Sequence, residues 1–248
     1  MKRIGIIGGM SWESTLHYYE QLNQRVNEEA GGLTSADMVL RSVNFDEFYQ
    51  LMKEDKWDVI EQKLYDEVRH LLVYEKCAYV AIATNTMHKV VPEISRQCFF
   101  RLRYDPIVHI GACIARECRK INVKKVLLLG TEFTMTENFM KKYLYDEHGI
   151  KSFSLRDKRD KINEINRIIF DELCRGVVSP DSKQFLIDFV NQTIRSDDPD
   201  AASVAHGSVA VVLGCTELGM ILQQEDVGLP VLDSTEAHLG QLVKLSLS

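Results

Sequence analysis

Short runs of consecutive apolar residues alternate along this chain with longer stretches in which apolar residues recur every three or four positions. Consecutive runs rich in Ile, Val and Leu predict strands buried on both faces, and the periodic stretches predict amphipathic helices that cover them. We therefore predict an α/β protein built on parallel sheets. The clearest helices are expected at residues 15–27, 57–74, 110–121 and 161–173.

The stretch from Trp57 to Tyr74 shows the helical pattern best. Its apolar side chains recur at three- and four-residue steps, at Ile60, Leu64, Val68, Leu71 and Leu72. We therefore expect one stripe of this helix to pack against a sheet.

The strand pattern occurs twice. The run Lys2–Gly9 has a counterpart in Lys124–Thr131, and each is a buried strand that opens into a loop. Later in each copy a second strand runs into a polar segment, which begins at Thr84 in the first copy and at Cys215 in the second. Short segments that begin with proline, residues 106–109 and 230–233, then close the two copies.

This duplication predicts two similar doubly wound parallel-sheet domains related by a pseudo-two-fold axis, with the active site in the cleft between them. The N-terminal domain is expected to comprise residues 1–105, completed by the C-terminal segment 229–248, and the second domain residues 106–228. Under such symmetry Thr84 and Cys215 would face one another across the cleft. Two proton-handling groups on opposite sides of a small molecule suit a reaction that inverts a stereocentre.

Composition narrows the class of partner. The chain has 248 residues, of which 45% are hydrophobic and 27% charged, as in ordinary globular proteins. Its net charge of −6 argues against a nucleic acid or an anionic membrane surface as partner, because phosphate binding needs clustered Lys and Arg. A small molecule is the expected partner.

The chain enters a strand at its first residues, and its apolar runs are too short for a secretory signal or a membrane span, so we expect a cytoplasmic protein. The six cysteines show no disulfide framework and are expected to stay reduced. Cys113 and Cys118 stand five residues apart on an expected helix, with no histidine at ligand spacing, so we expect no metal site.

Polar residues follow the second strand of each copy. They are Thr84, Asn85 and Thr86 in the first copy and Cys215, Thr216 and Glu217 in the second. Open parallel sheets bind ligands outside the carboxyl ends of their strands, where helix N-termini attract carboxylates. Thr86 and Thr216 are expected to cap the following helices, although capping alone would also explain them structurally.

Cys215 and Thr84 differ in chemical capacity. A cysteine at a helix N-terminus is expected to have a lowered pKa and to supply thiolate near neutral pH, whereas the alternative is a small buried apolar residue. The hydroxyl of Thr84 is a very poor base, and an ordinary capping threonine would look the same. The nearby His88 could orient a catalytic group or could be a partly buried structural residue.

The N-terminal loop, Gly5–Ser11, is glycine-rich but lacks the spacing of a dinucleotide fingerprint, and no phosphate-loop lysine follows it. We therefore do not expect nucleotide binding. Backbone amides of such a loop can still approach a small anion, and Thr131–Thr134 forms the equivalent loop of the second copy. Lys161, taken alone, would be interpreted as an ordinary solvated side chain.

Five segments carry a family resemblance. They are Gly8–Thr15, Thr84–Lys89, Gly130–Thr131 with Thr134–Met135, Lys161–Asn163 and Gly214–Glu217. Through them the chain resembles the cofactor-independent aspartate/glutamate racemase family, in particular its branch of broad-specificity amino-acid or L-aspartate/glutamate racemases.

The resemblance implies an isomerase that uses no pyridoxal phosphate or other cofactor, binds an amino acid and commonly forms a homodimer. It implies that Thr84 and Cys215 are the catalytic pair, one removing the Cα proton and the other returning a proton to the opposite face. The residues it implies for substrate binding are Met10, Ser11, Asn85, Thr86, Thr131, Thr134, Lys161, Thr216 and Glu217.

Two departures from the family pattern bear on activity. Thr84 stands where most members have a cysteine, so we expect slow turnover that differs in initial rate between the enantiomers. The Asn-Pro…Asp-Arg segment of aspartate-preferring members is replaced here by Val43–Glu47, which leaves Arg41 as the nearest guanidinium for a distal carboxylate.

Two alternatives remain at this point. The same duplicated scaffold serves enzymes of the maleate isomerase and arylmalonate decarboxylase type, which would consume a dicarboxylate without Cα exchange. From a different class, the chain could be a catalytically weak amino-acid-binding protein, because Thr84 removes one acid/base group.

Overall fold

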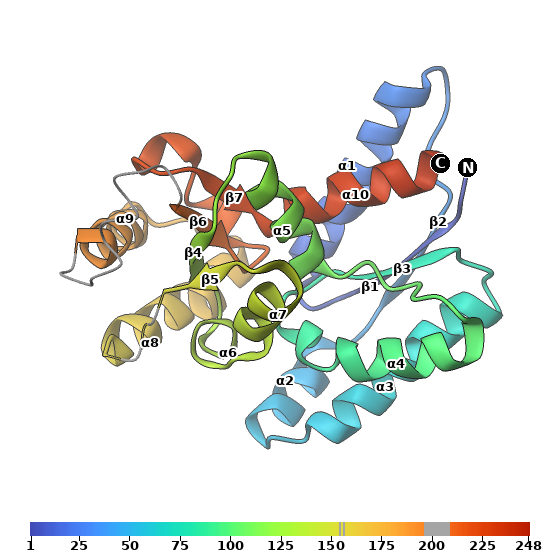
Figure 1. Cartoon of the computed structure of the whole chain (residues 1–248), viewed down its shortest axis with the longest axis horizontal. Coiled ribbons are helices and arrows are strands. Elements are labelled where there is room, and N and C mark those ends of the chain that lie inside the picture. Colours follow the sequence, from blue (N-terminus) through green and yellow to red (C-terminus); the bar gives the residue numbers. More distant parts are fainter. Residues whose placement is uncertain (154, 156, 196–208) are drawn as a thin grey trace. The chain divides into compact units, whose positions relative to one another are not determined.

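The computed structural model describes residues 1–153, 155, 157–195 and 209–248 (Figure 1). The chain divides into two compact units, and each is described by itself. Unit 1 comprises Met1–His109 with His238–Ser248, and unit 2 comprises Ile110–Ala237. The domain boundaries expected at residues 105/106 and 228/229 stay a prediction. None of the described helices is both long and apolar enough to cross a membrane.

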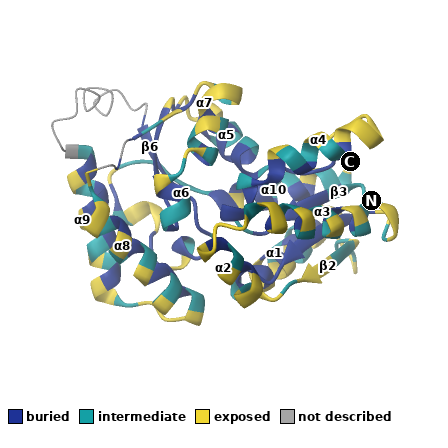
Figure 2. Cartoon of the chain, turned by 90° about the horizontal axis from the view of Figure 1, so that it is seen from below, coloured by how far each residue is buried: buried dark blue, intermediate teal, exposed yellow. Residues whose placement is uncertain are grey.

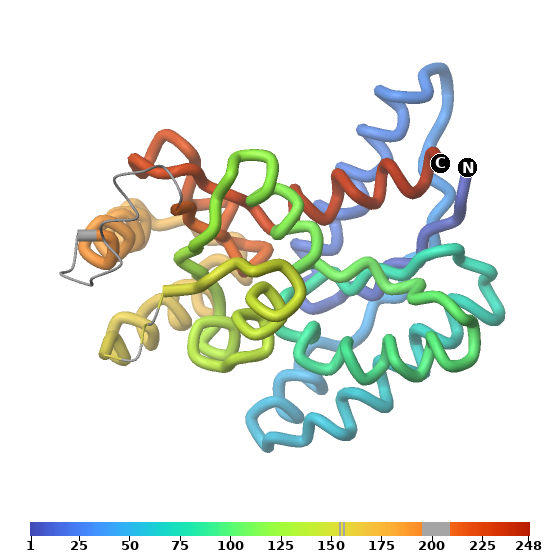
Figure 3. The backbone as a smooth tube through the Cα atoms, viewed as in Figure 1, coloured from blue at the N-terminus to red at the C-terminus, as the bar shows by residue number. Residues whose placement is uncertain are grey.

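Unit 1 is built on a parallel sheet of three strands in the order β2-β1-β3. Its helices and strands are β1 (Ile4–Gly8), α1 (Trp12–Ala30), β2 (Met38–Ser42), α2 (Phe45–Lys53), α3 (Trp57–Val73), β3 (Tyr79–Ile82), the 3-10 segment η1 (Thr86–Lys89) and α4 (Val91–Leu102). Most of α10 (Ser234–Leu247) also belongs to it. The N-terminal strand and this last helix are tied together, because the Lys2 N–H donates to the Ser246 carbonyl oxygen (2.7 Å; Figure 3).

Unit 2 is built on a parallel sheet of four strands in the order β5-β4-β6-β7. Its elements are α5 (Ile110–Lys120), β4 (Lys125–Leu129), α6 (Glu132–Thr136), α7 (Phe139–His148), β5 (Lys151–Ser152), α8 (Arg159–Arg167), the π-helical η2 (Ile168–Glu172), the 3-10 segment η3 (Leu173–Arg175), α9 (Pro180–Arg195), β6 (Val209–Leu213), the 3-10 segments η5 (Leu218–Met220) and η6 (Gln224–Asp226), and β7 (Val231–Asp233).

The core of unit 2 explains why its central strands, β4 and β6, are runs of consecutive apolar residues. In β4, Leu127 and Leu129 pack into a cluster with side chains of α8 and α9, whereas Val126 and Leu128 pack with side chains of α5 and α7. Alternate residues of a strand point to opposite faces, so helices cover both faces of the sheet. Strand β6 is buried along its whole length (Figure 2). The predicted doubly wound α/β class is confirmed.

The two units repeat one strand arrangement. Ile107 makes a parallel bridge to Val80 of β3, which gives unit 1 a counterpart of the β6–β7 pairing in unit 2. The closing segments are held alike: the Val80 N–H donates to the Pro106 carbonyl oxygen, and the Val211 N–H donates to that of Pro230, both at 2.9 Å. The duplication inferred from the sequence is therefore present in the hydrogen-bonding register.

The expected helices form with small differences. Helix α3 buries Ile60, Leu64, Val68 and Leu71, while Leu72 is only partly buried at the edge of the stripe. The helix expected at residues 161–173 begins earlier, at Arg159, and changes into a π-helix at Ile168. The apolar periodicity marked this segment correctly, but it does not distinguish an α-helical from a π-helical turn.

Candidate functional site

Thr84 and Cys215 occupy equivalent positions in their units. The Ala83 N–H donates to the carbonyl oxygen of Ile7 in β1 (2.9 Å), and the Gly214 N–H donates to that of Leu129 in β4 (2.6 Å). Thr84 and Cys215 are each the next residue, at the carboxyl end of a strand that pairs with the first strand of its unit. This is the edge at which parallel α/β sheets bind ligands.

The loop after β1 is held in shape by the start of α1. The Ser11 hydroxyl caps the helix by accepting from the Ser14 N–H (3.2 Å). Thr15 ties the loop twice, since its hydroxyl accepts from the Gly9 N–H and donates to the Ser11 carbonyl oxygen, both at 2.7 Å. Met10 and Ser11 are buried. The predicted binding residues of this loop therefore sit on a constrained backbone.

The buried ring of His88 lies next to the backbone of Thr84. The His88 Nδ1 lies 2.8 Å from the Thr84 carbonyl oxygen, and its ring packs edge-on against His109, with centroids 4.7 Å apart. Burial lowers the pKa of His88 to about 4, so the ring is neutral near pH 7. A neutral ring can donate its Nδ1–H to the carbonyl and hold the backbone at Thr84.

A second buried histidine extends this group. His238 accepts from the Tyr18 hydroxyl at Nδ1 (2.9 Å) and donates from Nε2 to the Val108 carbonyl oxygen (2.8 Å). Burial lowers the pKa of His238 to about 3. Sequence reasoning singled out His88 but missed the other members, Tyr18, His109 and His238, because they are far apart along the chain and show no shared spacing.

Cys215 and Glu217 form a buried pair in unit 2. The Cys215 thiol donates to Glu217 Oε2 (2.9 Å), and the Thr216 hydroxyl donates to the same oxygen (2.7 Å). Cys215 is 6% exposed and Glu217 4% exposed. Burial, followed by the charge of Glu217 and the nearby Cys174, raises the pKa of the Cys215 thiol well above its ordinary value. The thiol is therefore protonated at neutral pH.

The lowered pKa that the sequence led us to expect for Cys215 is wrong in this structure. The residues after Cys215 form only the 3-10 segment η5, which is too short to supply the dipole of an α-helix, and a carboxylate adjoins the sulfur. The expected caps are also not found among the described contacts: neither η1 nor η5 has a side-chain cap, and Thr216 turns to Glu217 instead.

The loop after β4 packs tightly against Gly214, the residue before Cys215. Thr131 caps α6 by accepting from the Thr134 N–H (3.4 Å), and both threonines are buried. A Cβ on Gly130 would lie 2.7 Å from the Gly214 carbonyl oxygen and 3.0 Å from the Cβ of Thr134. Glycine at position 130 thus lets Thr131 and Thr134 approach the strand end that carries Cys215.

Asn85 and Thr86 are buried directly after Thr84. Lys161 lies near the start of α8, where its amine donates to Gln192 of α9, and among the described contacts nothing joins it to Cys215 or Thr131. Arg41 of β2 is already paired bidentately with Glu67 of α3, at 2.7 and 2.9 Å. In the part of the chain that the structure describes, no cluster of three metal-ligating side chains occurs.

Comparisons with known proteins agree with this arrangement. The sequence profile of the Asp/Glu/hydantoin racemase family matches residues 7–242. A putative Asp/Glu racemase from Yersinia pestis is 33% identical, with full coverage of both chains and a TM-score of 0.85. An aspartate racemase homologue from Pyrococcus horikoshii is likewise 33% identical over both full chains, with a TM-score of 0.77.

A more distant structure, an aspartate racemase from Picrophilus torridus, shares the fold at 21% identity, covering 99% of this chain and 94% of its own, with a TM-score of 0.64. The family profile spans both copies of the duplicated pattern, including the strand ends that carry Thr84 and Cys215. This chain belongs to the Asp/Glu/hydantoin racemase family.

Proposed function

We propose that this protein is a cofactor-independent amino-acid racemase that inverts the Cα centre by two-base proton transfer, with Cys215 and Thr84 serving opposite faces of the substrate. The observation that carries the proposal is the equivalent position of the two residues. Each directly follows the residue, Ala83 or Gly214, whose N–H donates to the end of the first strand of its unit. A proton must leave one face of Cα and another must arrive on the opposite face, and a duplicated strand end supplies one group for each.

Glu217 gives Cys215 its proton chemistry in this proposal. The resting thiol is protonated and can deliver its proton to a Cα carbanion. In the opposite direction, the Glu217 carboxylate accepts the thiol proton, and the resulting thiolate removes the proton from Cα. The 2.9 Å contact between the two side chains supports this exchange, because a general base must lie within hydrogen-bond reach of the proton it takes.

Thr84 has the weaker role. Its hydroxyl is a poor base, so we propose that it relays a proton between solvent and the face of Cα that Cys215 does not serve, delivering it there in one direction and carrying the Cα proton away to solvent in the other. Racemisation has an equilibrium constant near unity, so any apparent direction must be kinetic. The proposal accordingly predicts slow turnover with unequal initial rates from the two enantiomers.

Substrate binding is proposed for residues at the two strand ends, in the loops after β1 and β4 and near the start of α8. They are Met10, Ser11, Asn85 and Thr86 in unit 1 and Thr131, Thr134, Lys161, Thr216 and Glu217 in unit 2. We further propose an acidic or broader amino acid as substrate and a homodimer as the working form. Arg41 is a poor candidate for holding a distal carboxylate, because its Nε and Nη2 atoms already donate to the Glu67 carboxylate.

The test is exchange of the Cα proton in deuterated water, followed by NMR without added cofactor. L- and D-aspartate, L- and D-glutamate and a panel of neutral amino acids serve as substrates, and Cys215→Ser is the matched variant because it keeps the shape of the side chain. Exchange that requires Cys215 supports the racemase. Chiral chromatography then shows whether the opposite enantiomer forms.

Three other outcomes would redirect the assignment. Thermal stabilisation by an amino acid without exchange would indicate a binding protein that has lost catalysis. Consumption of a dicarboxylate without Cα exchange would indicate a lyase or isomerase of the arylmalonate decarboxylase or maleate isomerase type. Equal initial rates from both enantiomers would contradict the unequal roles of Cys215 and Thr84.

A further inference from the structure

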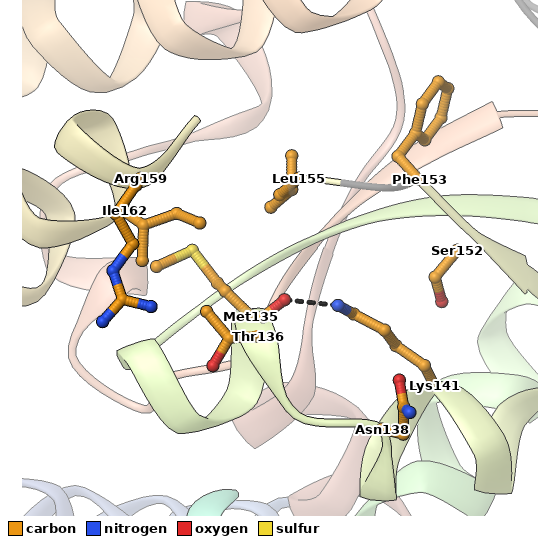
Figure 4. A pocket seen from close by; sticks show the side chains of 9 residues that line it. All are labelled: Met135, Thr136, Asn138, Lys141, Ser152, Phe153, Leu155, Arg159 and Ile162. Atoms are coloured by element: carbon orange, nitrogen blue, oxygen red, sulfur yellow. Dashed lines mark hydrogen bonds between the residues drawn. The ribbon is translucent and has the colours of Figure 1, made fainter. Parts of the chain in front are cut away.

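A cavity of about 610 Å³ in unit 2 lies among α6, α7, β5 and the start of α8 (Figure 4). Both cations that line it are engaged by the chain, since Lys141 donates to the Met135 carbonyl oxygen and Arg159 pairs with Glu132 at 2.8 Å. This lining does not select one class of ligand, whereas the buried histidines of unit 1 act on Thr84 itself. The residues that line the cavity are Met135, Thr136, Asn138, Lys141, Ser152, Phe153, Leu155, Arg159 and Ile162.

The backbone of Thr84 is held on both sides of its Cα atom. The Thr84 N–H donates to the Ile82 carbonyl oxygen (2.9 Å), and the Thr84 carbonyl oxygen accepts from His88 Nδ1 (2.8 Å). A threonine side chain is branched at Cβ and has few rotamers, so the position of the backbone determines where its hydroxyl lies. The hydrogen bond from His88 therefore helps to place the Thr84 hydroxyl.

The ring of His88 packs against two further histidine rings. Its centroid lies 4.7 Å from that of His109 and 6.2 Å from that of His238, and both pairs are edge-on. His238 is fixed in turn, because its Nε2 donates to the Val108 carbonyl oxygen (2.8 Å) and its Nδ1 accepts from the Tyr18 hydroxyl (2.9 Å). A carbonyl only accepts, so Nε2 carries the hydrogen and Nδ1 needs a donor. The Tyr18 hydroxyl is that donor.

Tyr18 connects this group to the other binding segment proposed in unit 1. It is fully buried in α1, the helix whose first turn is capped by Ser11. A series of contacts thus leads from α1 through His238 of α10 to His88 and ends at the carbonyl of Thr84.

The equivalent positions in unit 2 carry no histidine. Counted from the two strand ends, Gly219 corresponds to His88, and counted from the two prolines of the closing segments, Asp233 corresponds to His109. A Cβ on Gly219 would lie 2.2 Å from the Asp233 Oδ2 atom, so the carboxylate occupies the space that a side chain would need. The buried imidazoles therefore belong to the Thr84 side of the duplication.

We propose that Tyr18 and His238 are positioning residues for Thr84 in the racemase reaction. They hold the His88 ring, whose hydrogen bond to the Thr84 carbonyl keeps the Thr84 hydroxyl within reach of the substrate Cα. Proton transfer needs hydrogen-bond reach, and a displacement of about 1 Å can cost about 100-fold in rate. This inference rests on the proposed function.

A positioning role differs measurably from a merely structural one. Cys215 can exchange the Cα proton on its own face with solvent, without help from Thr84, whereas inversion needs both residues. Misplacement of Thr84 therefore slows inversion and leaves exchange on the Cys215 face intact. General loss of structure slows both together.

The experiment uses the full chain in deuterated water with both enantiomers of aspartate and of glutamate. NMR follows deuterium incorporation at Cα, and chiral chromatography follows the opposite enantiomer. Tyr18→Phe removes the hydroxyl and keeps the ring, and His238→Gln is the second variant. Tyr19→Phe is the matched control, because Tyr19 is the next residue of α1 and its side chain is exposed. Thermal unfolding checks that each variant is folded.

In Tyr18→Phe and His238→Gln, inversion at saturating substrate should slow by about tenfold or more, with KM and exchange on the Cys215 face within about twofold of the wild type. Tyr19→Phe should match the wild type in every measurement. The inference is overturned if Tyr18→Phe and Tyr19→Phe invert the substrate at the same rate, or if exchange and inversion fall in parallel. Absence of Cα exchange in the wild type would contradict the proposed racemase, whereas wild-type turnover with an unaffected Tyr18→Phe would contradict this inference alone.

Discussion

The buried ring of His88 predicts a measurable dependence of stability on pH. An exposed histidine in the unfolded chain titrates near 6.5, whereas burial lowers the folded pKa of His88 to about 4. As pH falls, the histidine of the unfolded chain is protonated at a higher pH than that of the folded chain. The contribution of the buried His88 to the free energy of unfolding is therefore complete above pH 6.5 and is lost as pH falls toward 4. At 1.36 kcal/mol for each pH unit, the loss between pH 7 and pH 4 is about 3 kcal/mol.

The assay is urea unfolding of the wild type and of His88→Gln at several pH values from 7 to 4. Glutamine retains an N–H donor for the Thr84 carbonyl but does not titrate, so the difference between the two unfolding free energies separates His88 from the carboxylates and reports it together with its effect on His238, whose pKa His88 lowers. The wild type should lose about 3 kcal/mol more than the variant. Parallel curves for the wild type and His88→Gln would refute the reasoning.

Three further predictions concern the strand ends and their loops. Glu217→Gln should lower the pKa of the Cys215 thiol, measured by the absorbance of the thiolate, because the neighbouring negative charge is removed. The same variant should slow Cα exchange by about 100-fold or more, because it lacks the group that accepts the thiol proton. Unchanged exchange would mean that the Glu217 carboxylate does not act as a base. Thr84→Cys should speed racemisation and make the initial rates from the two enantiomers more alike, as chiral chromatography can show, and a slower variant would contradict the assigned relay. Thr15→Val should destabilise unit 1 by about 1–3 kcal/mol in urea unfolding, since it removes the hydroxyl that accepts from the Gly9 N–H and one of the two hydrogen bonds to the Ser11 carbonyl, whereas Thr15→Ser keeps both bonds and should cost less than about 1 kcal/mol.

The fold could be predicted from the chain because its signal is local and repeated. Apolar runs such as Val209–Leu213 are buried on both faces, and that burial is visible in the sequence as consecutive branched residues. The strand-to-loop transitions at Thr84 and Cys215 are also local, so their equivalence could be inferred before any coordinates were known. Periodicity likewise located α3 to within one residue of its end.

The ionisation of Cys215 could not be predicted in this way. The sequence suggested a helix dipole and a lowered pKa, but the chain forms only a 3-10 turn there and turns the Glu217 carboxylate onto the sulfur. Desolvation depends on how completely the surrounding residues exclude water, and no local pattern reports that quantity.

The sequence by itself determined that this protein is a duplicated α/β chain with polar residues at its strand ends, because hydrophobic periodicity depends only on residues that are close together in the sequence. Only the tertiary structure decided which side chains meet at those ends. Tyr18 and His238 are 220 residues apart, yet their side chains are 2.9 Å apart in the core, and Lys141 and Ser152 line one cavity from different elements. Such contacts arise from packing of whole elements, which fixes distances that the order of residues along the chain leaves open.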